Sequence, residues 1–197
     1  MIKKWVFVFS FLLTVDCVWA QSNELTSYNQ QRLQITRIGM LTLGGWAVGN
    51  MAISGASLNN SSGPRYYFHQ MNVFWNVVNL GLSGFGYYQA STSDPTIFSL
   101  SESIQEQFGM EKLLLFNAGL DVAYLVSGFY LLERSRRNTS KAIRWKGYGQ
   151  SLILQGGFLL AFDTILYLIL HQQNSILFSF LAHIKPTFSG VGLICSF

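Results

Sequence analysis

Long apolar stretches alternate with short polar segments along this chain. Four of the stretches occupy residues 37–57, 66–88, 110–132 and 147–170. Each holds about 20 residues, which is the length that a helix needs to cross the hydrocarbon core of a bilayer. The pattern therefore predicts an all-α membrane protein in which four transmembrane helices form a bundle over residues 37–171.

The N-terminus has the pattern of a secretory signal. Two lysines precede an apolar run over residues 5–13, and residues of small or medium size precede a cleavage point after Ala20. Because an apolar run of about ten residues is too short to span a bilayer, a cleaved signal peptide over residues 1–20 is favoured over a membrane anchor. Lipid attachment at Cys17 is discounted, because Asp16 stands where such sites need a small residue.

Polar segments flank the predicted spans. Residues 21–36 predict a short periplasmic surface helix that leads into the first span, and residues 172–197 form a periplasmic or interfacial tail. Paired tyrosines at 66–67 and 87–88 lie about 31 Å apart along a helix, which matches the two interfacial belts of a membrane protein.

Charge indicates the orientation of the bundle. Only 11% of the 197 residues are charged, against about 25% in a typical soluble domain. Six basic residues lie between positions 134 and 146, whereas the 89–110 loop carries acidic residues and no lysine or arginine. Basic loops stay in the cytoplasm, and signal cleavage leaves residue 21 outside. Both signals place the mature N-terminus and the C-terminus in the periplasm, with the chain in a bacterial cytoplasmic (inner) membrane.

Polar side chains recur on one face of each predicted span. In the second span they follow steps of three and four residues, which places them within an arc of about 80° on a helix. Four polar stripes cannot all face lipid, so they are expected to face one another in a polar core. The candidate site residues of this core are Asn50, His69, Asn72, Asn76, Asn79, Asn117, Asp121, Gln155 and Asp163.

Two functions fit such a core. Depth along the helices predicts that Asn50, Asn79 and Asp121 meet near the bilayer midplane, and no lysine or arginine lies at that depth. Each buried aspartate is then protonated, held by amide donors, or compensated by a bound cation. The first hypothesis is a bundle that binds or moves a small cation, a proton or a polar ligand. The alternative is a structural or accessory subunit, in which the polar residues only join the helices by hydrogen bonds of roughly 0.6 to 2 kcal/mol a pair.

Other classes of function lack the residues they need. His69 and His171 lie at opposite ends of their spans, too far apart to ligate one haem iron. Signal cleavage leaves a single cysteine, which excludes a cysteine zinc site, and no HExxH or GxSxG motif supports an enzyme. We therefore expect no cofactor and no metal site. The expected partners are the lipid bilayer and a second membrane protein or a second copy of the chain, but not nucleic acid.

Four segments carry a resemblance to a known family. They read GGWAVGN (44–50), YFHQMNVFWNVVNLG (67–81), NAGLDVAYLVSGFYLLER (117–134) and GYGQSLILQGGFLLAFD (147–163). Together they resemble the signature segments of a family of small bacterial membrane proteins with no assigned function, over about residues 33–165. The resemblance implies a signal peptide and four helices, and it implies no activity, cofactor or partner.

The predicted orientation can be measured with reporter fusions. A reporter fused after Arg137 should be active as a cytoplasmic protein, and one fused after Asp94 should be active as a periplasmic protein, because basic loops resist translocation. Paired reporters that work only in one compartment check both positions. The opposite pair of results would mean that the signal is retained or that a span is miscounted.

Overall fold

A computed structural model describes the backbone of residues 2–137, 140–182, 184–187 and 190–193, and the side chains of residues 23–137 and 140–179. The elements in chain order are α1 (Ile2–Leu58), α2 (Gly63–Thr92), α3 (Leu100–Ser135), α4 (Ala142–Gln172), α5 (Asn174–Ala182), β1 (Ile184–Thr187) and β2 (Gly190–Leu193). The two short strands pair in antiparallel fashion. Helices make up nearly all of the described chain, which confirms the predicted helical fold class.

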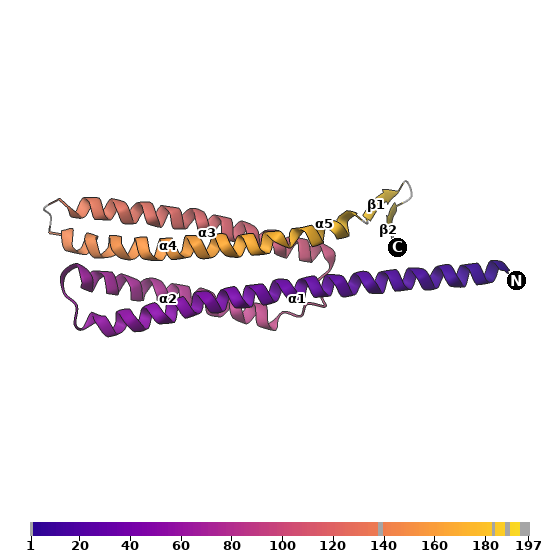
Figure 1. Cartoon of the computed structure of the whole chain (residues 1–197), viewed down its shortest axis with the longest axis horizontal. Coiled ribbons are helices and arrows are strands. Elements are labelled where there is room, and N and C mark those ends of the chain that lie inside the picture. Colours follow the sequence, from indigo (N-terminus) through magenta and orange to yellow (C-terminus); the bar gives the residue numbers. More distant parts are fainter. Residues whose placement is uncertain (1, 138–139, 183, 188–189, 194–197) are drawn as a thin grey trace.

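The four long helices form two antiparallel hairpins that lie one on the other (Figure 1). One hairpin is α1 and α2, and the other is α3 and α4. Within each hairpin the helices pack along their length, and α2 against α4 is the main contact between the hairpins. The α1–α2 and α3–α4 turns lie at one end of the bundle and the α2–α3 connection at the other (Figure 1). We call these the turn end and the connection end.

Helix α1 is continuous from Ile2 to Leu58, whereas a separate short helix over residues 21–36 was expected. The physical reason lies in the sequence: no glycine or proline occurs before Gly39, so nothing ends the helix before the bundle begins. In Figure 1 the N-terminal part of α1 extends past the other long helices. The side chains of residues 1–22 lie outside the described part, so the cleavage after Ala20 stays a prediction.

Local sequence signals determine where α2 and α3 begin. Gly63 adopts a positive φ of 59°, a left-handed conformation that favours glycine, and Pro64 follows in the first turn of α2. A capping box at Ser99 and Glu102 starts α3. The Ser99 backbone and hydroxyl donate hydrogen bonds to Glu102 and lower the pKa of its carboxyl. In the preceding loop, hydrogen bonds from Thr96 lower the pKa of Asp94 in the same way.

The distribution of polarity is inverted relative to a water-soluble protein. Among the described residues, 17 polar or charged side chains are buried but only ten apolar ones, while large apolar side chains are exposed on all four long helices. Two segments, Leu100–Ser135 and Ala142–Ser179, are long and apolar enough to cross a membrane. Only 17% and 28% of their most apolar stretches are buried, so they do not resemble the core helices of a soluble domain.

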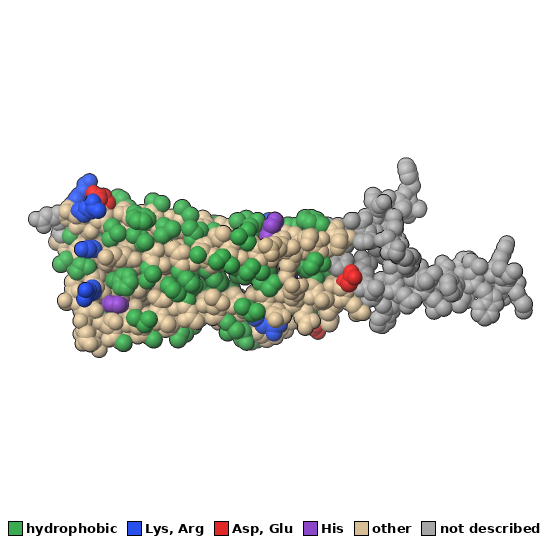
Figure 2. All heavy atoms as spheres, in the orientation of Figure 1, with side chains coloured by type: hydrophobic (Ala, Val, Ile, Leu, Met, Phe, Trp, Pro, Cys, Tyr) green, Lys and Arg blue, Asp and Glu red, His purple; other side chains and the backbone are tan. Residues whose placement is uncertain are grey.

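The space-filling view shows where charge lies on one face of the bundle. Figure 2 shows basic side chains gathered at the turn end, and mainly hydrophobic and uncharged groups over the middle of that face. The basic residues of the α3–α4 turn include Arg134, Arg136 and Lys141. The turn end of the bundle therefore carries a cluster of basic charge.

Glycines bring helix backbones together near the turn end. A Cβ at Gly128 would lie 2.9 Å from the carbonyl oxygen of Gly149, and one at Gly149 would lie 2.7 Å from that of Gly128. A Cβ at Gly147 would collide with the carbonyl oxygen of Pro64. A Cβ at Gly45 or Gly49 of α1, by contrast, would meet nothing within 4 Å.

The close approach of α3 and α4 predicts a sharp difference between two glycines of one helix. Gly128→Ala should destabilise the bundle by about 1–3 kcal/mol, because the added methyl group meets the backbone of α4, which cannot rotate away. Gly119→Ala should not destabilise it, because a Cβ there meets nothing within 4 Å. Thermal unfolding in detergent compares the two variants, and equal melting temperatures would contradict the packing described for Gly128.

Candidate functional site

Asn72 is the centre of a hydrogen-bond network between the two hairpins. Its side-chain oxygen accepts from the Ser151 hydroxyl at 2.7 Å and from the Gln155 amide at 3.0 Å. Its amide nitrogen donates to the Ser54 hydroxyl at 3.4 Å. Asn72, Ser151 and Gln155 are at most 2% exposed. One side chain of α2 therefore joins α1 and α4 through buried hydrogen bonds.

The network continues along α1. The Trp46 indole donates to the side-chain oxygen of Gln155 at 3.0 Å, and its ring stacks on Phe158 with 3.8 Å between ring centroids. His69 Nδ1 lies 3.2 Å from the Ser54 hydroxyl. Trp46 and Ser54 thus link α1 to α4 and α2, and they belong to the site although sequence reasoning did not include them among its candidates.

A second cluster consists of the carboxyl groups of Asp121 on α3 and Asp163 on α4. The two side chains lie close enough to hydrogen-bond each other, and they are 3% and 7% exposed. Two carboxyl groups can form such a bond only when one of them carries a proton, because an ionised carboxylate is only an acceptor. Asp121 Oδ2 has no further partner, so the pair keeps unused hydrogen-bonding capacity.

The remaining candidates take other positions. Asn50 donates to the carbonyl oxygen of Trp46 in its own helix, and Asn76 does the same toward Asn72. The amide nitrogen of Asn79 is buried without a partner. The expected meeting of Asn50, Asn79 and Asp121 is therefore not present as hydrogen bonds; the polar core is divided into the Asn72 network and the carboxyl pair.

An internal cleft of about 400 Å³ reaches Asp163. At the inner end its lining includes Asn117 and Asp163, and at the connection end it includes Ser93 and Glu106. Between these ends the lining is mostly apolar, with Met40, Leu43, Leu82, Phe85, Leu113, Leu114 and Phe162. Asp163, one member of the carboxyl pair, thus borders open space in the half of the bundle toward the connection end.

A further polar cluster at the connection end was not among the sequence candidates. Glu111 is 6% exposed, and its carboxylate accepts from Gln107 at 3.0 Å and from Asn174 at 2.7 Å. His171 lies 3.3 Å from it. Polar residues recur every four positions from Ser103 through Gln107 to Glu111, a helical face that could have been read from the sequence. The cluster ties α5 and the end of α4 to α3.

Comparison with known proteins now adds a family. The sequence model of DUF6992, a family of unknown function, matches residues 42–164. This stretch is more than half of the chain.

The chain belongs to the DUF6992 family.

No curated protein and no solved structure matches the chain. The DUF6992 match contains all nine sequence candidates, together with the Asn72 network and the carboxyl pair. Arg32, His171 and Asn174 lie outside the matched residues. The DUF6992 part of the chain is therefore the polar centre of the bundle, and part of the connection end lies beyond it.

The Asn72 network predicts a difference between two asparagines. Asn72→Leu should destabilise the protein by about 1–3 kcal/mol, because the Ser151 hydroxyl and the Gln155 amide would lose their buried acceptor. Asn50→Leu should have a clearly smaller effect, because the Asn50 amide bonds only to its own helix. Melting temperatures in detergent measure both, and an Asn72→Leu protein that melts like the wild type would show that the network does not hold the hairpins together.

Proposed function

We propose that the chain is a four-span protein of the bacterial inner membrane, with both termini in the periplasm, and that its carboxyl pair binds and releases a proton. The inverted polarity supports four spans. Large apolar side chains are exposed on α1 and α2, for example Ile53 and Phe85, as well as on α3 and α4. Helix α2 buries three asparagines on its inward face. Its lipid-facing side is as apolar as a span requires.

The observation that carries the proton proposal is the hydrogen bond between Asp121 and Asp163. A buried carboxylate is costly unless it is paired with a cation or hydrogen-bonded. Among the described residues, no lysine or arginine forms an ion pair with either carboxyl. A shared proton leaves one negative charge instead of two, so the pair is a site where proton uptake and packing are coupled.

The cleft supports exchange of that proton with the periplasmic side. It borders Asp163 at its inner end and carries Gln89, Ser93 and Glu106 at the connection end, which the proposed topology places outside. On the other side of the pair, glycines close the space between α3 and α4. Access from one side only is what a proton-binding site needs in order to respond to periplasmic pH.

An accessory subunit is the second candidate, and the Asn72 network favours it. Asn72 uses both its oxygen and its nitrogen in buried bonds to α1 and α4, as interhelical hydrogen bonds do when they only fix helix positions. In that case the carboxyl pair is a further fixed bond whose proton never exchanges. The two candidates differ in how stability responds to pH.

The proton proposal predicts a pH-dependent melting temperature in detergent. The shared proton is present at low pH, where the pair is fully stabilising, and its loss as the pH rises leaves two adjacent buried negative charges. The melting temperature should therefore fall by about 5 °C or more between about pH 5 and pH 9. Asp163→Asn should remove most of this fall, because an amide keeps a hydrogen bond without titrating.

Asp94→Asn is the matched control, because Asp94 is an exposed loop carboxylate. This substitution should leave the fall in melting temperature at high pH unchanged. A wild-type melting temperature that ignores pH and matches that of Asp163→Asn would favour the accessory subunit. A melting temperature that depends on sodium or potassium concentration and not on pH would replace the proton with a metal cation.

A further inference from the structure

Arg32 on α1 is a buried cation with unused hydrogen-bond donors. The residue is only 4% exposed, and Nη1 lies 3.7 Å from a carboxylate oxygen of Glu106, whose side chain is 53% exposed. Nε and Nη2 have no partner. Burial lowers the pKa of the guanidinium, and Glu106 opposes that shift, but an arginine keeps its charge in proteins. Two buried nitrogens, which carry three N–H bonds, therefore lack an acceptor, and this is costly for a charged group.

Arg32 lies at one end of the internal cleft. The lining runs from Arg32 to Leu43 on α1, from Leu82 of α2 to Ser93, which follows the end of that helix, and from Glu106 to Asn117 on α3. In each case these limits are eleven residues apart, or about 16 Å at 1.5 Å per residue. The charged end is at the connection end of the bundle, and the walls beyond it are apolar. This form suits a long molecule with one charged head.

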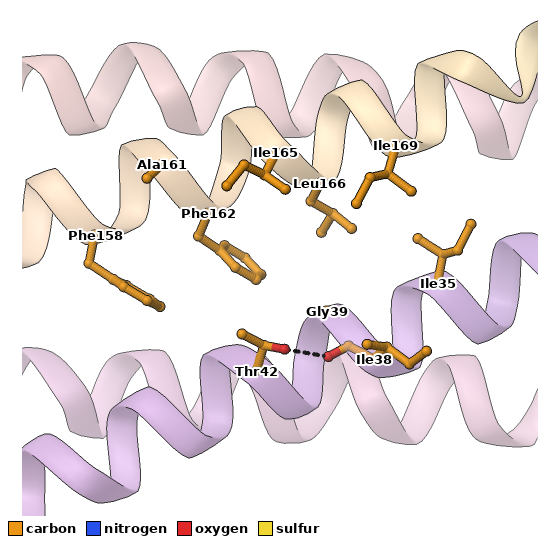
Figure 3. A pocket seen from close by; sticks show the side chains of 10 residues that line it. All are labelled: Ile35, Ile38, Gly39, Thr42, Phe158, Ala161, Phe162, Ile165, Leu166 and Ile169. Carbon is orange, nitrogen blue, oxygen red and sulfur yellow. Dashed lines mark hydrogen bonds between the residues drawn. The ribbon is translucent and has the colours of Figure 1, made fainter.

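A second, apolar crevice adjoins the cleft. It has a volume of about 380 Å³, and its lining includes Ile35, Ile38, Ala161 and Ile165 from α1 and α4. Figure 3 shows these side chains facing the space between the two helices, with the ring of Phe162 projecting from α4 toward α1. Phe162 lines both spaces. The crevice thus gives the cleft an apolar neighbour between α1 and α4.

We infer that the cleft binds an amphiphile with a single anionic head and an apolar chain. The head accepts hydrogen bonds from the free N–H groups of Arg32, and the chain lies between α1, α2 and α3 toward Asn117. A volume of about 400 Å³ with mostly apolar walls and few polar groups is typical of small-molecule sites. The positive charge selects an anion, although Glu106 at the rim weakens that selection. This site goes beyond the proposed proton function, because Arg32 takes no part in the carboxyl pair.

The inference is tested by native mass spectrometry of the full chain released from a nonionic detergent. Decanoate should bind, while decanol, which has the same chain and no charge, should bind about tenfold more weakly because it lacks a charge-assisted hydrogen bond. Inorganic phosphate alone should not bind, because it fills none of the apolar volume. A phosphatidylglycerol arm distinguishes the source, since a lipid preferred over decanoate would identify the ligand as a membrane lipid.

Substitutions in the cleft test separately how the protein binds the anionic head and the apolar chain of the ligand. Arg32→Gln should reduce decanoate binding to the level of decanol, and Arg37→Gln is the matched control, since Arg37 does not line the cleft. Ala90→Leu, which adds bulk to the wall and keeps Arg32, should weaken decanoate and decanol alike. Decanoate binding that Arg32→Gln leaves unchanged, or tighter binding of decyltrimethylammonium than of decanoate, would overturn the inference. Asp121→Asn should lose the pH response and keep decanoate binding, so failure of one proposal is distinguishable from failure of the other.

Discussion

The requirement that a buried polar group find a partner on another helix governs this structure. With more polar than apolar side chains buried, burial of apolar surface contributes less to joining these helices than it does in a typical soluble domain. Asn72 meets the requirement for three helices at once. The Asp121–Asp163 pair meets it for α3 and α4. The positions of the two hairpins follow from which polar groups can reach each other.

The sequence predicted which face of a helix carries the polar side chains, but it did not predict which residues those side chains contact. Helical periodicity placed the polar side chains of α2 on one side, and four of them are buried there, Asn72, Asn76, Asn79 and Ser83. It could not say that Asn72 meets Gln155 while Asn50 bonds to its own helix, because that depends on how far one helix is shifted along another. The shift of α2 along α4 is limited by backbone contacts such as Gly147 against Pro64, which no periodicity reveals.

The buried polar residues that the sequence did not predict were missed for one reason. Polar residues before the apolar stretches, such as Arg32 and Gln107, had been assigned to surface segments, yet α1 and α3 continue through them as helix and bury them. Predicted span boundaries mark where apolar composition begins and not where packing begins. The connection end is therefore richer in unsatisfied polar atoms than the composition suggested, from Tyr28 and Asn29 to Asn174.

The glycine contacts near the turn end also have a mechanical meaning. Where the backbone of α3 touches that of α4 at Gly128 and Gly149, no side-chain rotation can absorb a displacement, so this end is stiff. The other half of the bundle contains the cleft and the crevice and is compliant by comparison. In the proposed membrane topology, a change in the lateral pressure or thickness of the bilayer would splay the two hairpins about the stiff end.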